Sequence, residues 1–339
     1  MTTIKDVAQY SGVSLTTVSR VINGSEKVTP KTKAKVDQAI KELGYFPNKA
    51  ARSLVTKRAD SIAVLFRNLH DPFFSELIRG IEDAASASGR NVIFCSLGKN
   101  EKVRDRYIEY LTNGISDAII LYGSLFSDKT MIDHLYKVHF PFLLIENNFQ
   151  TVPVNQFLID NFNGAKTAVE YLINRGHTRI AHVMGNPNKR VILERFRGYS
   201  ETMLAHGLLI RDHYIQKTVD KSAVSMPLFE DMMKRPPHER PTAIFCSDDK
   251  IAIQVIRALN ALGLSVPDDV SVVGFDNLQS YEISYNGPRI TSIQQPLYQI
   301  GYDSILAINS ILKGNSTEFV DKTYSTSLVE HDTVIDCRI

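Results

Sequence analysis

The chain has 339 residues, of which 43% are hydrophobic and 22% charged. This length exceeds one ordinary domain, and this composition excludes a disordered chain. The net charge of +2 hides an asymmetry, because residues 1–58 contain eleven Lys and Arg but only four Asp and Glu. A basic N-terminal segment on an acidic body predicts contact with nucleic acid at one end only. A basic surface that is merely solvated is the alternative.

The first two predicted helices are separated by a tight turn. Thr3 and Asp6 have the spacing of a capping box, which predicts a helix that starts at residue 4. Gly12 favours a turn, and Ser14 is positioned to cap a second helix that runs to about Ile22. Two short helices around a glycine-containing turn predict a helix-turn-helix, whose second helix contacts base edges in DNA.

A third helix is predicted to start at Thr29-Pro30, with an apolar stripe at Val36, Ile40 and Leu43. Basic residues near its start suit phosphate contacts: Lys27, Lys31, Lys33 and Lys35. After Pro47, a fourth, very short helix is predicted at residues 48–55, too short to be stable alone. Leu54 in this basic segment fits a minor-groove wedge, and a plain linker is the alternative.

Residues 4–23, 44–48 and 51–54 closely resemble the LacI/GalR family of transcription repressors. The resemblance implies that Leu15, Thr16 and Arg20 read the major groove, supported by Asn23 and Lys27. It also implies that residues 48–55 form the hinge helix of the family, in which Leu54 opens the centre of the operator. With the cap residues, the predicted DNA-binding set is Thr3, Ser14, Leu15, Thr16, Thr17, Ser19, Arg20, Asn23, Lys27, Thr32, Asn48, Ala51 and Leu54.

After residue 58, short apolar strands alternate with helices. Strands are predicted at residues 61–66, 91–95, 118–121, 142–145, 180–184, 243–245 and 270–275, and helices at 73–88, 103–112, 129–137, 164–174, 191–206 and 249–262. This alternation predicts an α/β fold with two doubly wound parallel-sheet lobes, preceded by the small all-α head. Ligands of such folds bind at the carboxyl ends of the strands.

The resemblance to the LacI/GalR family continues through the body, at residues 71–74, 80–82, 176–181, 194–199, 241–245, 266–277 and 291–296. It implies the fold of periplasmic sugar-binding proteins, with two lobes joined by three crossings near residues 160, 290 and 323. The expected domains are a DNA-binding head (1–46), a hinge (47–58) and an effector-binding domain (59–339). Its N-lobe is expected at about 59–160 and 291–322, and its C-lobe at about 161–290 and 323–339.

Candidate effector ligands follow the predicted strand ends. Side chains with several hydrogen-bonding groups suit adjacent sugar hydroxyls, and an aromatic ring covers a sugar face. The predicted effector-binding set is Asp71, Phe73, Asn147, Arg195, Asp248, Asp276 and Gln295, in which the resemblance gives most weight to Arg195 and Asp276. Asp71 can instead cap the helix that follows it, Asp249 is expected to cap its own helix, and Phe74 is expected in the core.

Three departures from the family pattern leave the effector's identity open. Arg67 stands where the family usually has Pro, Glu146-Asn147 replaces a more common Asp-Arg pair, and residues 218–222 lack an expected aromatic. A neutral polyol fits an Arg195 balanced by acids better than a dianion does.

Other function classes have little support in the sequence. It has no Gly-x-Gly-x-x-Gly, Walker A or Gly-x-Ser-x-Gly motif, so we expect no catalytic residue, metal or cofactor. Cys95, Cys246 and Cys337 match no disulfide or metal spacing, and the first two are expected to be buried thiols. Neither a signal core nor a membrane-length apolar run is present, which predicts a cytoplasmic protein without membrane contact.

The sequence therefore predicts a transcriptional regulator, most simply a repressor of sugar-utilisation genes. It is expected to bind a palindromic operator as a homodimer and to be released by a small sugar. The last residues carry no leucine-heptad pattern, which favours a dimer over a tetramer. The alternatives are control by a purine-like corepressor or a phosphorylated partner protein, and a solute-binding protein.

Overall fold

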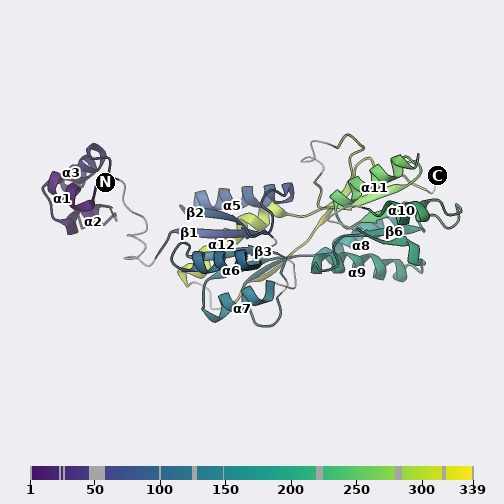
Figure 1. The fold of residues 1–339 in the computed structure, drawn as a ribbon, viewed down its shortest axis with the longest axis horizontal. Coiled ribbons are helices and arrows are strands. Elements are labelled where there is room, and N and C mark those ends of the chain that lie inside the picture. The colour runs from purple at the N-terminus through teal and green to yellow at the C-terminus, as the bar shows by residue number, and fades with distance from the viewer. Residues whose placement is uncertain are drawn as a thin grey trace. The chain divides into compact units, whose positions relative to one another are not determined.

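The protein is described from a computed structural model (Figure 1). The description covers residues 2–22, 24, 25, 27–45, 58–98, 101–123, 128–147, 149–218, 224–278, 285–314 and 318–337. The predicted hinge helix, with Asn48, Ala51 and Leu54, lies outside the described residues, as does Asn23. The chain divides into a small N-terminal unit that ends at Asp60 and a large unit that begins at Ser61.

The N-terminal unit is a three-helix head. Its helices are α1 (Ile4–Ser11), α2 (Leu15–Ile22) and α3 (Pro30–Glu42). The predicted caps are confirmed, because Thr3 and Asp6 form a capping box and the hydroxyl of Ser14 accepts from the Thr17 amide at 3.2 Å. The buried core of the head consists of Val7, Val18, Val21, Val36 and Ala39.

The first lobe of the large unit contains a six-stranded parallel sheet in the order β11-β5-β4-β3-β1-β2. Its strands are β1 (Ser61–Phe66), β2 (Asn91–Ser96), β3 (Ala118–Tyr122), β4 (Phe142–Ile145), β5 (Gln156–Ile159) and β11 (Asp321–Tyr324). Its helices are η1 (Pro72–Phe74), α5 (Ser75–Ala87), α6 (Glu101–Thr112), α7 (Lys129–Lys137) and α12 (Leu297–Lys313).

The second lobe contains another six-stranded sheet in the order β12-β10-β9-β8-β6-β7. Its strands are β6 (Ile180–Met184), β7 (Ile215–Lys217), β8 (Ala243–Cys246), β9 (Ser271–Phe275), β10 (Thr291–Gln294) and β12 (Ser327–Val329). Its helices are α8 (Asn161–Asn174), α9 (Arg190–Ala205), η3 (Asp212–Tyr214), α10 (Met226–Met233) and α11 (Asp249–Ala261). The sheet is parallel except at its edge, where β12 pairs antiparallel with β10.

The two-lobed fold class is confirmed, and the sheets place the crossings predicted near residues 290 and 323 a few residues further along the chain. β10 belongs to the second sheet, so the chain returns to the first lobe after Gln294 and not at residue 290. β11 keeps the chain in the first lobe as far as Tyr324, two residues beyond the predicted limit. The helix α12, which the sequence interpretation did not include, packs against α5 in the core of the first lobe (Figure 1).

Glycines set the close approach of α5 to α12. A Cβ atom on Gly80 would lie 2.1 Å from the carbonyl oxygen of Tyr298, and one on Gly301 would lie 2.2 Å from that of Leu77. Because both obstructing atoms are backbone, only glycine fits at these two positions.

Candidate functional site

The exposed surface of α2 carries the residues predicted to read DNA. Leu15 is 45% exposed, and Thr16 and Arg20 are exposed beside it. Val18 and Val21 on the opposite face are buried in the head. The helix therefore presents a polar outer face with one apolar side chain, as a recognition helix requires.

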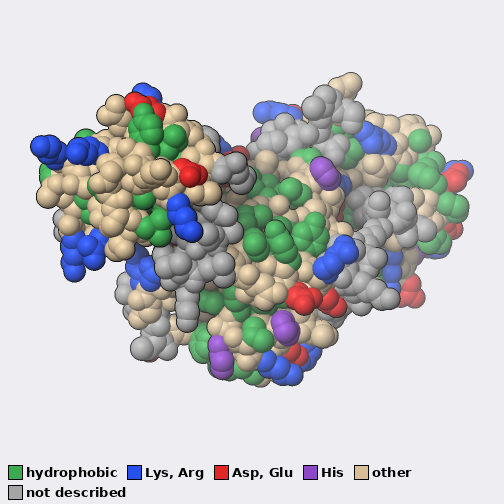
Figure 2. Space-filling view, turned by 60° about the vertical axis from the view of Figure 1, so that its left-hand side comes forward, with side chains coloured by type: hydrophobic (Ala, Val, Ile, Leu, Met, Phe, Trp, Pro, Cys, Tyr) green, Lys and Arg blue, Asp and Glu red, His purple; other side chains and the backbone are tan. Residues whose placement is uncertain are grey.

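Exposed lysines lie just before α3 and in its first two turns. Lys27, Lys31, Lys33 and Lys35 are all exposed, and Figure 2 shows blue side chains spread over the surface of the protein. Ser14, Thr17 and Thr32 take part in helix caps, with the Thr32 amide donating to the Thr29 hydroxyl at 3.3 Å. The predicted DNA-binding residues inside the described part of the head thus form its helix starts and the outer face of α2.

Arg195 is the centre of a polar cluster between the two lobes. Its side chain is 6% exposed, and its guanidinium carbon lies 3.6 Å from the centroid of the Phe275 ring. Its Nη1 donates to the carbonyl oxygen of Ser247 at 2.6 Å and lies 3.3 Å from Oδ1 of Asp276. Its Nε donates to Oδ1 of Asn161 at 2.8 Å. Arg195 is therefore fixed on several sides, and is not the exposed helix residue that its position in α9 alone favours.

Asp276 joins several of the predicted effector residues. Burial raises the pKa of its carboxyl to about 7. The Arg195 guanidinium and a hydrogen bond from Gln295 lower this pKa, whereas the nearby Asp248 and Asp71 carboxylates raise it. Five predicted residues, Asp71, Arg195, Asp248, Asp276 and Gln295, are thus near enough to influence one titration. Gln295 is 5% exposed, and its Oε1 is buried without a hydrogen-bond partner in the described structure.

An aromatic group lies at the first-lobe side of this cluster. Phe73 packs edge to face with Tyr122, with their ring centroids 6.0 Å apart. Burial raises the pKa of the Tyr122 hydroxyl well above its usual range, and the carboxylates of Glu146, Asp276 and Asp71 raise it further. Tyr122 was missed by sequence analysis, although its place at the end of a predicted strand is a usable signal. Phe74 is buried, as expected.

An ion pair connects the lobes directly. Nζ of Lys250 in α11 lies 2.6 Å from Oδ1 of Asp71, which also accepts from the Phe73 amide at 3.1 Å. Asp71 therefore caps η1 and pairs across the lobes.

The prediction that Asp249 caps its own helix is wrong, because Asp248 caps α11 through the Ile251 amide at 2.9 Å. The carboxylate of Asp249 is fully buried instead, accepting from the Leu278 amide and the Ser292 hydroxyl.

Asn147 directly follows Glu146, just after β4 in the first lobe. Its Nδ2 is close to Gly123, and so is the carboxylate of Asp128, which pairs with Arg67. Arg67 and Glu146, two of the departures from the family pattern, are thus both engaged by buried polar groups. The Nδ2 of Asn147 is buried without a hydrogen-bond partner among the described residues.

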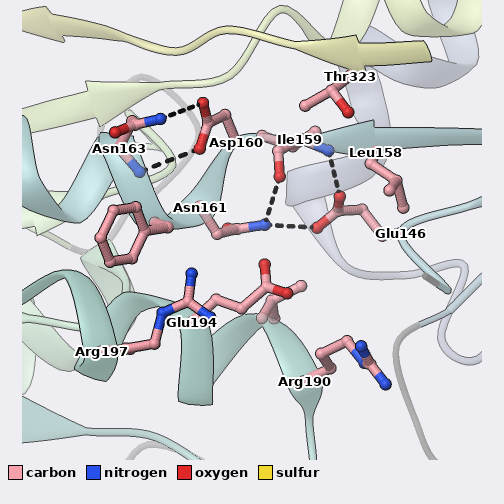
Figure 3. Close-up of a pocket in the computed structure, with 12 residues that line it drawn as sticks. Glu146, Leu158, Ile159, Asp160, Asn161, Asn163, Arg190, Glu194, Arg197 and Thr323 are labelled. Carbon is pink, nitrogen blue, oxygen red and sulfur yellow. Dashed lines mark hydrogen bonds between the residues drawn. The ribbon is translucent and has the colours of Figure 1, made fainter.

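A hollow of about 280 Å³ opens beside the cluster, at the crossing between the lobes (Figure 3). None of the seven predicted effector residues lines it. Its walls are the crossing segment 158–163, Glu146, Thr323 and the first two turns of α9. Figure 3 shows Asn161 hydrogen-bonded to Glu146 on its wall, with Glu194 and Arg197 on the α9 side. Asn161 belongs to both regions, since it also holds Arg195.

Two family models match the chain, one on each side of residue 58. The model described as bacterial regulatory proteins of the lacI family matches residues 3–48, and the model described as periplasmic binding proteins and sugar binding domain of the LacI family matches residues 59–331. The chain belongs to the LacI family. It is accordingly a DNA-binding transcriptional regulator and not an enzyme.

Relatives and solved structures agree with this assignment over the full length. The chain is 34% identical to catabolite control protein A of Priestia megaterium, across 95% of both chains, and 33% identical to the HTH-type transcriptional repressor PurR of Vibrio campbellii, across 94% of both. A lac repressor dimer bound to operator and the anti-inducer ONPF is 26% identical, with a TM-score of 0.83 and coverage of 98% and 99%. A complex of the transcriptional regulator CelR with cellobiose is 29% identical, with a TM-score of 0.72 and coverage of 98% and 100%.

Two further findings concern the described residues only. They contain no helix with the length and apolarity needed to cross a membrane. They also contain no group of three His, Cys, Asp or Glu side chains that could hold a metal ion. Cys95 and Cys246 are buried, as expected, and Cys337 is exposed.

Proposed function

We propose that this regulator is a cytoplasmic repressor that binds a palindromic operator as a homodimer and releases it when a neutral sugar binds between the lobes. The observation that carries the effector class is the charge balance around Arg195. Three cations of the region each face a carboxylate: Arg195 faces Asp276, Lys250 faces Asp71, and Arg67 faces Asp128.

An anionic ligand such as a sugar phosphate finds no cation in this set that lacks a counter-charge, and the carboxylates of Glu146 and Asp248 would repel it. A neutral ligand with many hydroxyl groups meets no such penalty. It can donate to the partnerless Oε1 of Gln295 and accept from the guanidinium of Arg195. The rings of Phe73 and Tyr122 offer an apolar surface for a sugar face. The likeness to a cellobiose-bound regulator supports the same ligand class.

For DNA binding, we assign base contacts to Leu15, Thr16 and Arg20, and phosphate contacts to the helix starts and to the lysines of α3. The exposure of one face of α2 supports the first assignment, and amides at helix starts support the second. Asn23, Asn48, Ala51 and Leu54 keep the roles that the family resemblance implies.

A purine-like ligand is the second candidate, favoured by the aromatic rings of Phe73 and Tyr122, since one aromatic face can stack on a flat base. A thermal-shift screen of the full-length protein separates the candidates, because a ligand of the native state raises the melting temperature by mass action. The probes are D-glucose, D-galactose, D-ribose, cellobiose, glucose 6-phosphate and hypoxanthine, each at 5 mM, on the order of a hundred times a micromolar-range Kd. We expect a shift with at least one neutral sugar; a shift with only the phosphate or only the purine rejects the proposal.

The DNA assignment is tested on a palindromic site selected from random duplexes by the native protein. Arg20→Ala should weaken binding to this site by about 10- to 100-fold, as expected for loss of a base contact. Arg106→Ala removes an exposed arginine of α6 and serves as the matched control. Equal affinities of the Arg20→Ala variant and the native protein would remove Arg20 from the interface.

A further inference from the structure

A continuous chain of buried polar side chains joins the first lobe to Arg195. Oε2 of Glu146, which follows β4, accepts from Nδ2 of Asn161 at 2.9 Å, and Oδ1 of Asn161 accepts from Nε of Arg195 at 2.8 Å. Glu146 is 4% exposed and Asn161 is 1% exposed. We refer to Glu146, Asn161 and Arg195 as the polar bridge.

The amide of Asn161 has no freedom in this arrangement. Its Nδ2 donates to Glu146 and also to the carbonyl oxygen of Ile159 at 3.1 Å. Its Oδ1 accepts a hydrogen bond from Nε of Arg195. Reversing the amide would place its NH2 group against the Arg195 guanidinium and its oxygen against a carboxylate. Such a reversal loses three hydrogen bonds in a buried site, so the orientation of Asn161 is fixed by its neighbours.

The backbone of Glu146 is also held in an uncommon conformation. Its φ is +63°, in the left-handed region that non-glycine residues rarely adopt. Oε1 of Glu146 accepts from the Ile159 amide at 2.6 Å, so both carboxylate oxygens are used by the crossing segment. A strained residue whose side chain is fully engaged indicates that the surrounding structure selects this position for the carboxylate.

We propose that Glu146 and Asn161 are positioning residues, which set the plane and position of the Arg195 guanidinium for the effector. The proposal rests on the proposed function, since it concerns the response of the same site to its ligand. Neither residue needs to touch the effector. Asn161 acts on Arg195 directly, and Glu146 acts on Arg195 through Asn161.

Because Glu146 acts on Arg195 only through Asn161, the effects of removing the two residues are coupled. Removing Asn161 deletes its bond to Arg195, and removing the Glu146 carboxylate loosens the amide that makes this bond, so the losses should not multiply when both are removed. Two residues that stabilise the lobe independently, or that contact the effector separately, would give losses in affinity that multiply.

The experiment uses the full-length protein and isothermal titration calorimetry. The probe is whichever of D-glucose, D-galactose, D-ribose and cellobiose raises the native melting temperature most. The variants are Glu146→Gln, Asn161→Ala and the double substitution, and the control is Glu170→Gln on the outer face of the same helix α8. Melting temperatures without sugar show whether each variant is folded.

We expect each single variant to weaken sugar binding by about tenfold, and the double variant by about tenfold instead of about a hundredfold. The control should bind as the native protein does. Losses that multiply, or unchanged affinity in Glu146→Gln, would overturn the positioning role while leaving the proposed function intact. Glu146→Gln preserves side-chain volume and decides alone if Asn161→Ala does not fold. If none of the four sugars shifts the native melting temperature, the proposed function and this inference both fail.

Discussion

Replacing Arg195 with methionine tests the electrostatics of the interlobe cluster without any ligand. The guanidinium of Arg195 lies 3.3 Å from Asp276 and lowers the pKa of the Asp276 carboxyl. The substitution removes this cation. An orphaned buried charge usually costs about 3–5 kcal/mol of stability. Because the pKa of Asp276 is already about 7, the carboxyl can take up a proton near neutral pH at little cost. We therefore expect a smaller loss at pH 7, set by packing and by the lost bonds to Asn161 and Ser247.

The loss should grow above neutral pH. A carboxyl whose pKa is raised in the folded state binds more protons than in the unfolded state, so stability falls as pH rises through the window between the two values. Removing Arg195 moves the upper end of this window above 7. The gap in unfolding free energy between Arg195→Met and the native protein should therefore widen by about 1.4 kcal/mol per pH unit above pH 7. Glu146, whose pKa of about 7 is also lowered by Arg195, contributes in the same direction.

The assay is urea-induced unfolding followed by circular dichroism at pH 6.5, 7.5 and 8.5. Arg106→Met, which removes an exposed arginine of α6, should show a constant gap from the native protein and serves as control. A gap for Arg195→Met that stays constant or narrows with rising pH would refute the electrostatic reasoning.

Three further predictions concern stability. Gly301→Ala should lower the free energy of unfolding by about 2–3 kcal/mol, since its Cβ would lie 2.2 Å from the Leu77 carbonyl oxygen, and an unchanged melting temperature would contradict this packing. Burial lowers the pKa of His182 to about 3, so the unfolded state binds more protons below pH 6.5, and stability should fall as pH falls from 6.5 towards 4. His182→Asn should flatten this part of the urea-measured profile, and a profile identical to that of the native protein would exclude His182. Thr3→Ala should cost the head about 1 kcal/mol through loss of the α1 cap, seen as faster amide hydrogen exchange in α1 with unchanged exchange in α8.

The sequence predicted local structure well where the pattern is local. The caps at Thr3 and Ser14 depend on neighbours within three residues, and both form as predicted. The fully buried strands β1 and β4 are continuous apolar runs, and their bounds match the prediction. The helix α12 was missed although its buried residues recur at helical spacing and Gly314 ends it, so the signal was present in the sequence.

The sequence predicted which residues belong to the site but not which partners they contact. Strand ends pointed to Asp71, Asp248 and Asp276, and these residues do gather around Arg195. The partners that hold Asp71 and Arg195, Lys250 and Asn161 respectively, come from the other lobe and from the crossing. Contacts between residues 179 positions apart, as for Asp71 and Lys250, leave no pattern in a single sequence.

The most direct test of the proposed regulation is an operator titration with and without sugar. Fluorescence anisotropy would measure the affinity of the native full-length protein for the selected palindromic DNA, at fixed salt, with and without a saturating concentration of the sugar from the thermal-shift screen. A sugar-released repressor should lose affinity by about 5- to 150-fold, the usual range of allosteric coupling. An affinity that rises or stays unchanged when the sugar is bound would contradict release of the operator by a sugar.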